Sequence, residues 1–195
     1  MFWVGKKHFV SIADYEDRFM EVNPKDLMSP ALIELLSSIP KDETSRYTIQ
    51  GNERYRNKDY ESAVDNYTKA IELKYDNIEA LYYRGLCYIK LEKYNNCVTD
   101  LTKIIDIHPD FVEAYFYRAN ARAALQTFKQ LKDAILDYSI VLEDNDKNGL
   151  CYYLRGYCYL QLQKDTLAYS DWKNAKVLGV AQESEANWKN DYLHK

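Results

Sequence analysis

The sequence predicts an all-α protein, an α-solenoid in which one helix–turn–helix unit occurs four times. Two series of small residues, one on the first helix of each unit and one on the second, recur at nearly constant spacing. The first series is Gly51, Gly85, Ala119 and Gly156, at intervals of 34, 34 and 37 residues. The second is Ala63, Cys97, Ala134 and Ala168, at intervals of 34, 37 and 34 residues. With only 6 Gly and 4 Pro, the chain has few positions for tight turns, which favours helix over strand.

Residues 1–43 do not match the repeat and form an N-terminal arm. This arm is rich in large apolar side chains, among them Phe2, Trp3, Phe9 and Phe19. It is too apolar to remain solvated as an ordinary polar tail, so we expect it to pack on another surface. A Ser-Pro pair and an Ile-Pro pair bound a predicted short helix over 31–39. The sequence leaves open whether the arm caps the first repeat or occupies the binding groove.

Four repeats follow, over about 44–77, 78–111, 112–148 and 149–182. The two small-residue series lie 12 residues apart in three repeats and 15 apart in the third, which places three extra residues near Leu125–Leu131. We expect this insertion to form a protruding turn or to lengthen a helix. In residues 183–195, Trp188, Tyr192 and Leu193 lie partly at helical spacing and predict a C-terminal capping helix.

The second repeat carries a recognisable pattern. Its marker residues are Gly85, Tyr88, Tyr94, Cys97 and Pro109. This pattern resembles the tetratricopeptide repeat, which has a Gly, aromatic residues, a small residue and a Pro at fixed offsets. The resemblance implies a right-handed solenoid of paired helices. It also implies a scaffold that recognises another protein, with the ligand in a concave groove formed by the first helix of each repeat.

Carried over position by position, the resemblance predicts which side chains face the groove. They are Thr48, Asn52, Tyr55, Tyr82, Leu86, Ile89, Phe116, Asn120, Tyr153, Tyr157 and Leu160. An aromatic, apolar groove suits an amphipathic helix or an extended peptide with bulky side chains. Asn52 and Asn120 could hydrogen-bond a peptide backbone through their amides. The alternative is that several of the 19 tyrosines fill seams between helices.

The chaperone-binding members of this family hold a C-terminal carboxylate in a clamp of Lys, Asn, Asn, Lys and Arg. Here only Asn52 matches, and the other four places hold Thr48, Tyr83, Glu113 and Tyr117. A glutamate in a place where the clamp needs lysine would repel a carboxylate. The sequence therefore disfavours a carboxylate-clamp co-chaperone.

A charge pattern also recurs in the last three repeats. Arg84, Arg118 and Arg155 precede the small residue of each first helix. Asp100, Asp137 and Asp171 follow the small residue of each second helix. These residues form ion pairs at helix seams, or else the arginines meet an acidic ligand.

Composition excludes several function classes. The net charge of -4 argues against nucleic acid as a partner. No apolar run reaches the roughly 18 residues of a membrane span, and the N-terminus lacks a signal-peptide core, which predicts a cytoplasmic protein. The four cysteines fall at interior-type positions, and His8, His108 and His194 are scattered, so we expect no metal, cofactor or catalytic site.

The sequence thus predicts a non-enzymatic scaffold or adaptor that binds a partner's peptide or amphipathic helix in an aromatic groove. Two alternatives stay open. A structural component of a larger assembly would use the arm and the convex face. A self-associating regulator would pass its arm into the groove of a neighbouring copy.

Overall fold

The computed structural model describes residues 42–180, which fold into helices joined by short turns. The helices are α3 (Glu43–Arg56), α4 (Tyr60–Leu73), α5 (Ile78–Lys90), α6 (Tyr94–Ile107), α7 (Val112–Ala124), α8 (Phe128–Asp144), α9 (Gly149–Gln161) and α10 (Asp165–Val177). Residues 1–41 of the expected arm, with its helix over 31–39, and the capping helix expected over 183–195 lie outside the described residues.

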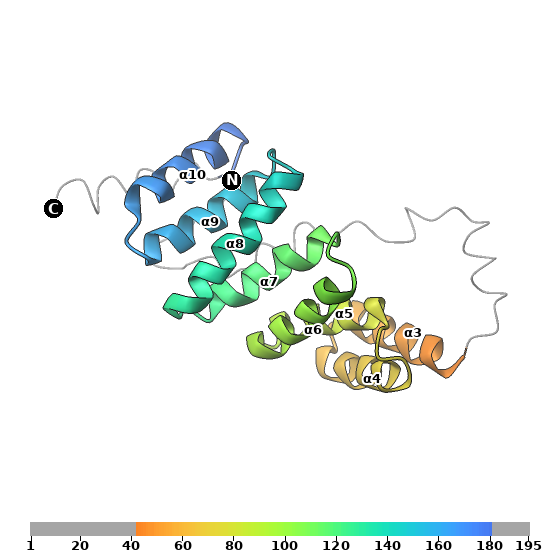
Figure 1. The fold of residues 1–195 in the computed structure, drawn as a ribbon. Helices are drawn as coiled ribbons and strands as arrows, with labels where there is room; N and C mark the ends of the chain where they lie inside the picture. The colour runs from red at the N-terminus through yellow and green to blue at the C-terminus, as the bar shows by residue number, and fades with distance from the viewer. Residues whose placement is uncertain (1–41, 181–195) are drawn as a thin grey trace.

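The eight helices of the described part pack as consecutive pairs, and each helix also packs on the next one along the chain. Figure 1 shows the pairs stacked in chain order, with α3 and α10 at opposite ends of the array. The first helices of neighbouring pairs touch as well, α3 with α5, α5 with α7 and α7 with α9. They line one side of the array, which we call the inner face. The predicted all-α solenoid of repeated helix pairs is confirmed.

Each pair turns through the same short connection. Three residues separate the two helices of every pair, and the middle one has a left-handed backbone. These middle residues are Lys58, Glu92, Gln126 and Gln163, with φ between 52° and 60°. Side-chain caps also mark helix starts, for example Asp42, which accepts a 2.7 Å hydrogen bond from the backbone N–H of Ser45.

The insertion in the third repeat lengthens a helix. The turn that precedes α8 is as short as the other three, whereas α8 has 17 residues against 14 in α4 and α6. The chain therefore gains nearly one extra turn of α8, which is one of the two predicted outcomes.

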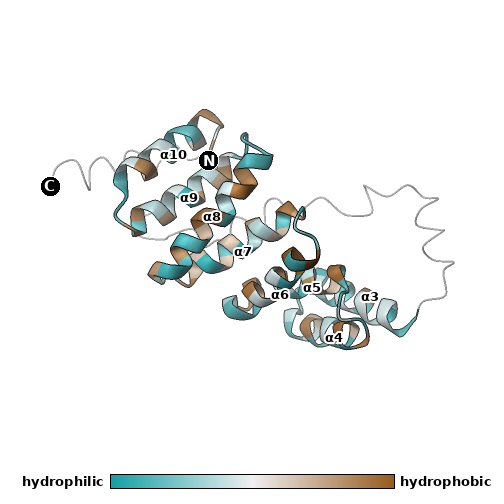
Figure 2. Cartoon of the chain, in the orientation of Figure 1, coloured by the Kyte–Doolittle hydropathy of each residue, from teal (hydrophilic) through white to brown (hydrophobic). Residues whose placement is uncertain are grey.

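The core lies between the helices of each pair and between neighbouring pairs. All four small residues of the second series, Ala63, Cys97, Ala134 and Ala168, are fully buried. Figure 2 shows hydrophilic and hydrophobic segments alternating along the helices, as expected when one side of each helix faces the core. Burial raises the pKa of the Cys87, Cys151 and Cys158 thiols to about 12. These thiols therefore stay protonated near neutral pH.

The recurrent arginines and aspartates form ion pairs within their own repeats. Arg84 donates through Nε and Nη2 to the two carboxylate oxygens of Asp100, both at 2.8 Å. Arg118 and Arg155 pair in the same way with Asp137 and Asp171. The structural interpretation of this pattern is confirmed.

A third bond joins each arginine to the preceding repeat. The Nη1 groups of Arg84, Arg118 and Arg155 donate to the hydroxyls of Thr68, Thr102 and Ser139, at 2.9 to 3.1 Å. Each guanidinium therefore fastens one repeat to the one before it. The side chains of these arginines are only 10–17% exposed, so they offer little to an acidic ligand.

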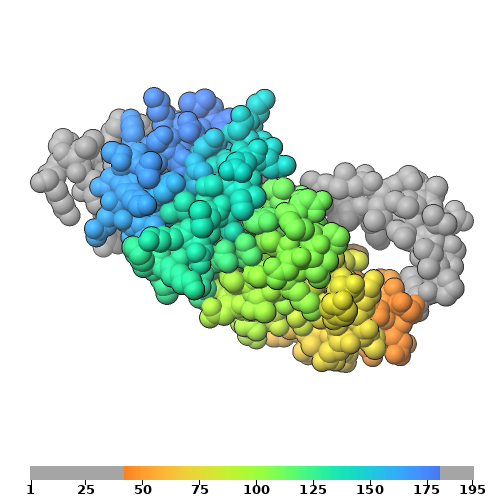
Figure 3. All heavy atoms as spheres, in the orientation of Figure 1, coloured from red at the N-terminus to blue at the C-terminus, as the bar shows by residue number. Residues whose placement is uncertain are grey.

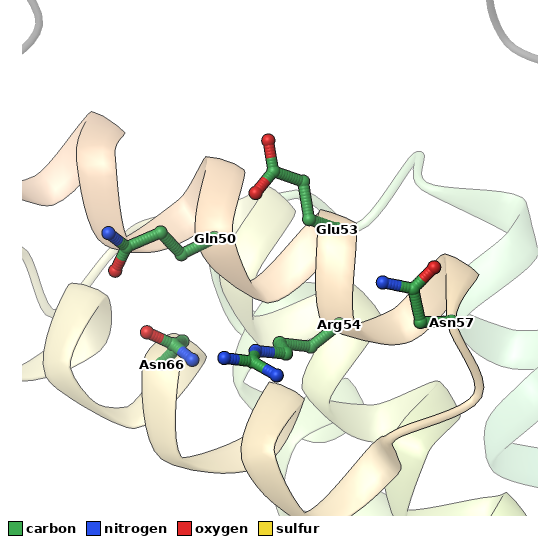
Figure 4. Close-up of a pocket in the computed structure, with 5 residues that line it drawn as sticks. All are labelled: Gln50, Glu53, Arg54, Asn57 and Asn66. Carbon is green, nitrogen blue, oxygen red and sulfur yellow. The ribbon is translucent and has the colours of Figure 1, made fainter.

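The first repeat replaces this ion pair with two neutral amides. Gln50 and Asn66 stand at the positions that Arg84 and Asp100 hold one repeat later. Both line an open pocket of about 340 Å³ at the α3 end of the array, together with Glu53, Arg54 and Asn57 (Figure 4). Within residues 42–180 no helix precedes α3, so no preceding repeat is there to offer a hydroxyl to an arginine or to cover an ion pair. This polar surface suits the end face of a repeat array.

Candidate interaction face

A continuous chain of aromatic rings crosses the first three repeats, and we call it the aromatic ladder. In order of contact its members are Tyr60, Tyr55, Tyr83, Tyr82, Tyr117, Phe116 and Tyr138. Successive ring centroids are 5.4–6.2 Å apart, and every one of these pairs meets edge to face. This is a favourable geometry for aromatic pairs.

The middle of the ladder belongs to the first helices. Tyr55 lies on α3, Tyr82 and Tyr83 lie on α5, and Phe116 and Tyr117 lie on α7. All five are half-buried, so each packs on its neighbours and still exposes part of its ring. Because these helices line the inner face, the ladder runs across that face.

Further aromatic rings pack against the ladder, and the tyrosines at its buried side are completely covered. Tyr67 stacks on Tyr83 at 6.2 Å, and Phe111 meets Tyr82 edge to face at 5.5 Å. Tyr67 and Tyr138 are both fully buried. The half-exposed rings are therefore held in place by core side chains.

The hydroxyls of the ladder lie in an environment influenced by carboxylates. Burial raises the pKa of Tyr82, and so do its hydrogen bond with Tyr117 and the charge of Glu113. Burial also raises the pKa of Tyr83, and Glu79 raises it further while Arg56 lowers it. Both tyrosines therefore stay neutral at physiological pH and keep their O–H groups as hydrogen-bond donors and acceptors.

The two asparagines expected in the groove are engaged within the chain. Asn52 Oδ1 accepts a 2.7 Å bond from the Tyr67 hydroxyl, and its Nδ2 donates to Glu79 at 2.8 Å. Asn120 Oδ1 likewise accepts a 2.7 Å bond from the Tyr138 hydroxyl, and Asn120 is only 2% exposed. The Asn120 Nδ2 group has no hydrogen-bond partner among the described residues. Glu79 accepts the hydrogen bond of the Asn52 amide, but the equivalent position in the repeat after Asn120 holds Leu150.

Other expected groove residues lie below the surface. Leu86 and Ile89 are 2% and 3% exposed because they pack into the core beneath the inner face, and Thr48 is 5% exposed. With Asn120, these side chains have almost no surface to offer a ligand. Tyr153, Tyr157 and Leu160 on α9 are half-buried, as are Asn52 and the ladder residues Tyr55, Tyr82 and Phe116.

Two ladder members, Tyr83 and Tyr117, were absent from the groove positions expected from sequence. Each follows directly after an expected groove residue, Tyr82 or Phe116, and they lie 34 residues apart. The signal that could have found them is this recurrence of an aromatic pair at the same place in consecutive repeats. An extra aromatic residue beside a groove position widens the face that the helix presents.

Neither a metal cluster nor a membrane-crossing helix is found in the described part. Over residues 42–180, no group of three or more His, Cys, Asp or Glu side chains is arranged to hold a metal ion. No helix in the same range has both the length and the apolar character to span a bilayer.

Family models match the first half of the array. A model described as "TPR repeat" matches residues 51–92, and one described as "Tetratricopeptide repeat" matches residues 79–110. This part of the chain therefore consists of tetratricopeptide repeats (TPRs). Scaffolds of this family are typically non-catalytic and serve protein–protein interaction. No curated protein matches the chain in sequence.

Solved structures share the fold over most of the array. MamA 41-end from Desulfovibrio magneticus RS-1 superposes with a TM-score of 0.66 at 18% identity, over 74% of this chain and 79% of its own. Another structure, a crystal structure of MamA protein, gives 0.66 at 20% identity, over 70% and 73%. The first TPR of Spaghetti (RPAP3), bound to the HSP90 peptide SRMEEVD, gives 0.58 at 25% identity, over 64% and 97%.

Proposed function

We propose that this TPR protein is a scaffold or adaptor that binds another protein along the aromatic ladder on its inner face. The observation that carries the proposal is the ladder itself, a row of half-exposed rings held rigidly over a packed core. Tyrosine rings of this kind bury large apolar area at low entropy cost and still offer a hydroxyl. The ligand is a peptide or amphipathic helix whose bulky side chains pack against Tyr82, Phe116 and Tyr117.

The contact set differs from the one that the family pattern implies. Its centre consists of half-exposed rings that adjoin one another: Tyr55, Tyr82, Tyr83, Phe116 and Tyr117. The half-buried Tyr153 and Tyr157 continue the inner face onto the fourth repeat. Asn52 remains half-exposed, but its amide reaches a ligand only by giving up its bonds to Tyr67 and Glu79.

Charge on the inner face favours some peptides over others. Glu79 and Glu113 are exposed near the start of α5 and α7, and both lie close enough to the ladder tyrosines to raise their pKa values. An acidic peptide such as SRMEEVD, the ligand of the RPAP3 TPR, would meet these carboxylates. We therefore propose a ligand that is not acidic. The four cysteines are buried and form no disulfide within residues 42–180, which supports a reducing, cytoplasmic location.

The test is a pull-down from native lysate with the immobilised full chain, and captured proteins are identified by mass spectrometry. The inner-face variant is Tyr82→Ala with Phe116→Ala. The matched control, Leu73→Ala with Tyr75→Ala, removes exposed apolar side chains elsewhere, which are 52% and 69% exposed. We expect a partner that the wild type and the control retain and the inner-face variant loses, with unchanged far-ultraviolet circular dichroism.

A second candidate function is a structural component of a larger assembly. It is favoured by exposed apolar side chains at the ends of second helices, Leu73 and Ile107, which occupy equivalent positions in consecutive repeats. In the same pull-down, a partner lost by the Leu73/Tyr75 control and retained by the inner-face variant would support this candidate and contradict binding on the ladder.

The charge preference has its own measurement. Fluorescence anisotropy of labelled SRMEEVD should reveal no saturable binding to the wild-type chain. Saturable binding that weakens in Tyr82→Ala would overturn the proposed rejection of acidic ligands.

A further inference from the structure

The outward side of α8 differs from that of every other second helix in the described array. Leu136 and Ile140 are 63% and 38% exposed. The equivalent positions in α4, α6 and α10 are polar: Asp65, Thr99 and Ser170 match Leu136, and Lys69, Lys103 and Asn174 match Ile140. Apolar side chains at these two positions are not needed for stacking, because the other three repeats stack with polar residues there. They therefore indicate a contact that only this helix makes.

The exposed residues of α8 form a narrow stripe. We define the α8 stripe as Lys129, Lys132, Leu136, Ile140 and Glu143, all of which are exposed. At 3.6 residues per turn these five positions fall within an arc of about 80° on the helix surface. Phe128 and Asp144 flank the stripe, and Phe128 is 66% exposed. The extra turn of α8 belongs to the repeat that carries this stripe, and Figure 3 shows the region of α8 (teal) at the molecular surface.

The α8 stripe is positively charged on one side of its apolar centre and negatively charged on the other. Lys129 and Lys132 lie toward the start of the helix, and Glu143 lies toward its end beside Asp144. Lys132 rests over the Phe128 ring at 4.3 Å, and none of these four charged residues forms an ion pair within residues 42–180. Their charges are available to a partner.

We propose that two copies of this chain pair through α8, antiparallel about a two-fold axis at Leu136. An axis at this residue sets Lys129 of each copy opposite Glu143 of the other, and Lys132 opposite Ile140. Leu136 meets its own counterpart, so the apolar centre is buried, and Lys129 meets a Glu143 carboxylate at each end. Such self-complementarity is what an isologous contact requires, and it is the reason for choosing a second copy over an unrelated partner.

The pairing leaves the aromatic ladder free. The middle of the ladder lies on the first helices α3, α5 and α7, and its member on α8, Tyr138, is fully buried. The α8 stripe lies on the exposed side of that helix. A dimer of this kind would present two inner faces to its ligands. The inference is independent of the proposed function, because it concerns a different surface and a different partner.

Multi-angle light scattering of the full chain tests the pairing. We expect the wild-type mass to rise with concentration from 23.0 kDa toward twice that value. Leu136→Glu should stay at the monomer mass, because the axis would then bring two carboxylates together. Ser170→Glu, at the equivalent exposed position of α10, should dimerise as the wild type does. A wild-type chain that remains monomeric up to about 100 μM, or a Leu136→Glu chain that still dimerises, would overturn the proposal.

Charge reversal tests the antiparallel register. Lys129→Glu and Glu143→Lys should each raise the dimer dissociation constant by at least about fivefold, because each change turns two attractive pairs into repulsive ones. The double variant should return to within about threefold of wild type, because both reversed charges then face each other across the axis. Single variants that leave the constant unchanged, or a double variant weaker than both singles, would contradict this register.

Discussion

Neutralising one carboxylate of the ion-pair series tests how the repeats are held together. Asp100 accepts two 2.8 Å bonds from Arg84, and the two side chains are 6% and 15% exposed. Asp100→Asn keeps the shape of the side chain and removes its charge. Burial has the largest single effect on the pKa of Arg84 and lowers it, but the hydrogen bonds and charge of Asp100, with smaller effects of Tyr88 and Glu72, together raise this pKa above its ordinary value. A guanidinium remains charged at any accessible pH. The variant therefore leaves a mostly buried cation without its counter-ion.

Breaking a buried pair by removing one partner costs about 3–5 kcal/mol, and the partial exposure of Arg84 places this case near the lower limit. We expect Asp100→Asn to lower the free energy of unfolding by about 3 kcal/mol, and the melting temperature by roughly 6–12 °C. Urea unfolding followed by circular dichroism measures the first quantity, and differential scanning calorimetry measures the second.

The first repeat supplies the compensating variant. It holds Gln50 and Asn66 in place of this ion pair, so the double variant Arg84→Gln with Asp100→Asn copies a combination that the chain already uses. We expect it to be more stable than Asp100→Asn alone, with a coupling energy of about 1–3 kcal/mol. Asn66→Ala is the control and should cost less than about 1 kcal/mol. A loss in Asp100→Asn no larger than in the control, or additive losses in the double variant, would refute the reasoning.

Three further predictions concern the core and the turns. Gly51→Ala should lower stability by about 1–3 kcal/mol, because the new Cβ would lie 2.5 Å from the buried ring of Tyr67. Gly85→Ala should be neutral or stabilising, because the atom nearest to its new Cβ is a leucine methyl at 3.3 Å. The three thiols with pKa raised to about 12 should resist Ellman's reagent in the folded chain at pH 8 and react once urea unfolds it. Glu92→Gly should raise stability by up to about 1 kcal/mol, because its φ of 55° strains any residue with a Cβ.

Each of these predictions has a control in the same chain. Equal urea midpoints for the two glycine variants would contradict the first. For the second, Ser170→Cys places a thiol at an exposed position and should react at once in the folded state. For the third, Glu53→Gly, within α3, should lower stability by about 1 kcal/mol, and a loss of the same size in Glu92→Gly would contradict the strain argument.

The raised thiol pKa values also set the sign of a pH effect. A thiol that titrates near 9.0 when unfolded and near 12 when folded binds more protons in the folded state between these values. Its contribution to stability is therefore complete below pH 9 and is lost as the pH rises toward 12. Urea midpoints measured from pH 8 to pH 11 should fall.

The period of the sequence predicted much of the fold, and the resemblance to the tetratricopeptide repeat predicted part of the candidate site. The spacing of small residues located the helix pairs, and its one irregularity located the insertion that the structure places in α8. The recurrence of Arg84 and Asp100 in later repeats predicted ion pairs, because residues at equivalent positions of stacked units meet equivalent neighbours. Tyr55, Tyr82 and Phe116 were expected in the groove because the resemblance to the tetratricopeptide repeat implies it.

Only the tertiary structure decided which of these side chains are accessible. A place in the repeat determines the direction in which a side chain leaves its helix, but the side chains of neighbouring helices determine how far it is covered. Asn120 leaves α7 at the position that Asn52 has on α3, yet it is only 2% exposed and accepts a hydrogen bond from Tyr138. Asn52 donates to Glu79, whereas the position equivalent to Glu79 beside Asn120 holds Leu150. Tyr83 and Tyr117 become part of the ladder because the rings of adjacent repeats meet there. Local period is encoded in the order of residues, whereas burial depends on contacts between repeats and is settled only when the helices pack.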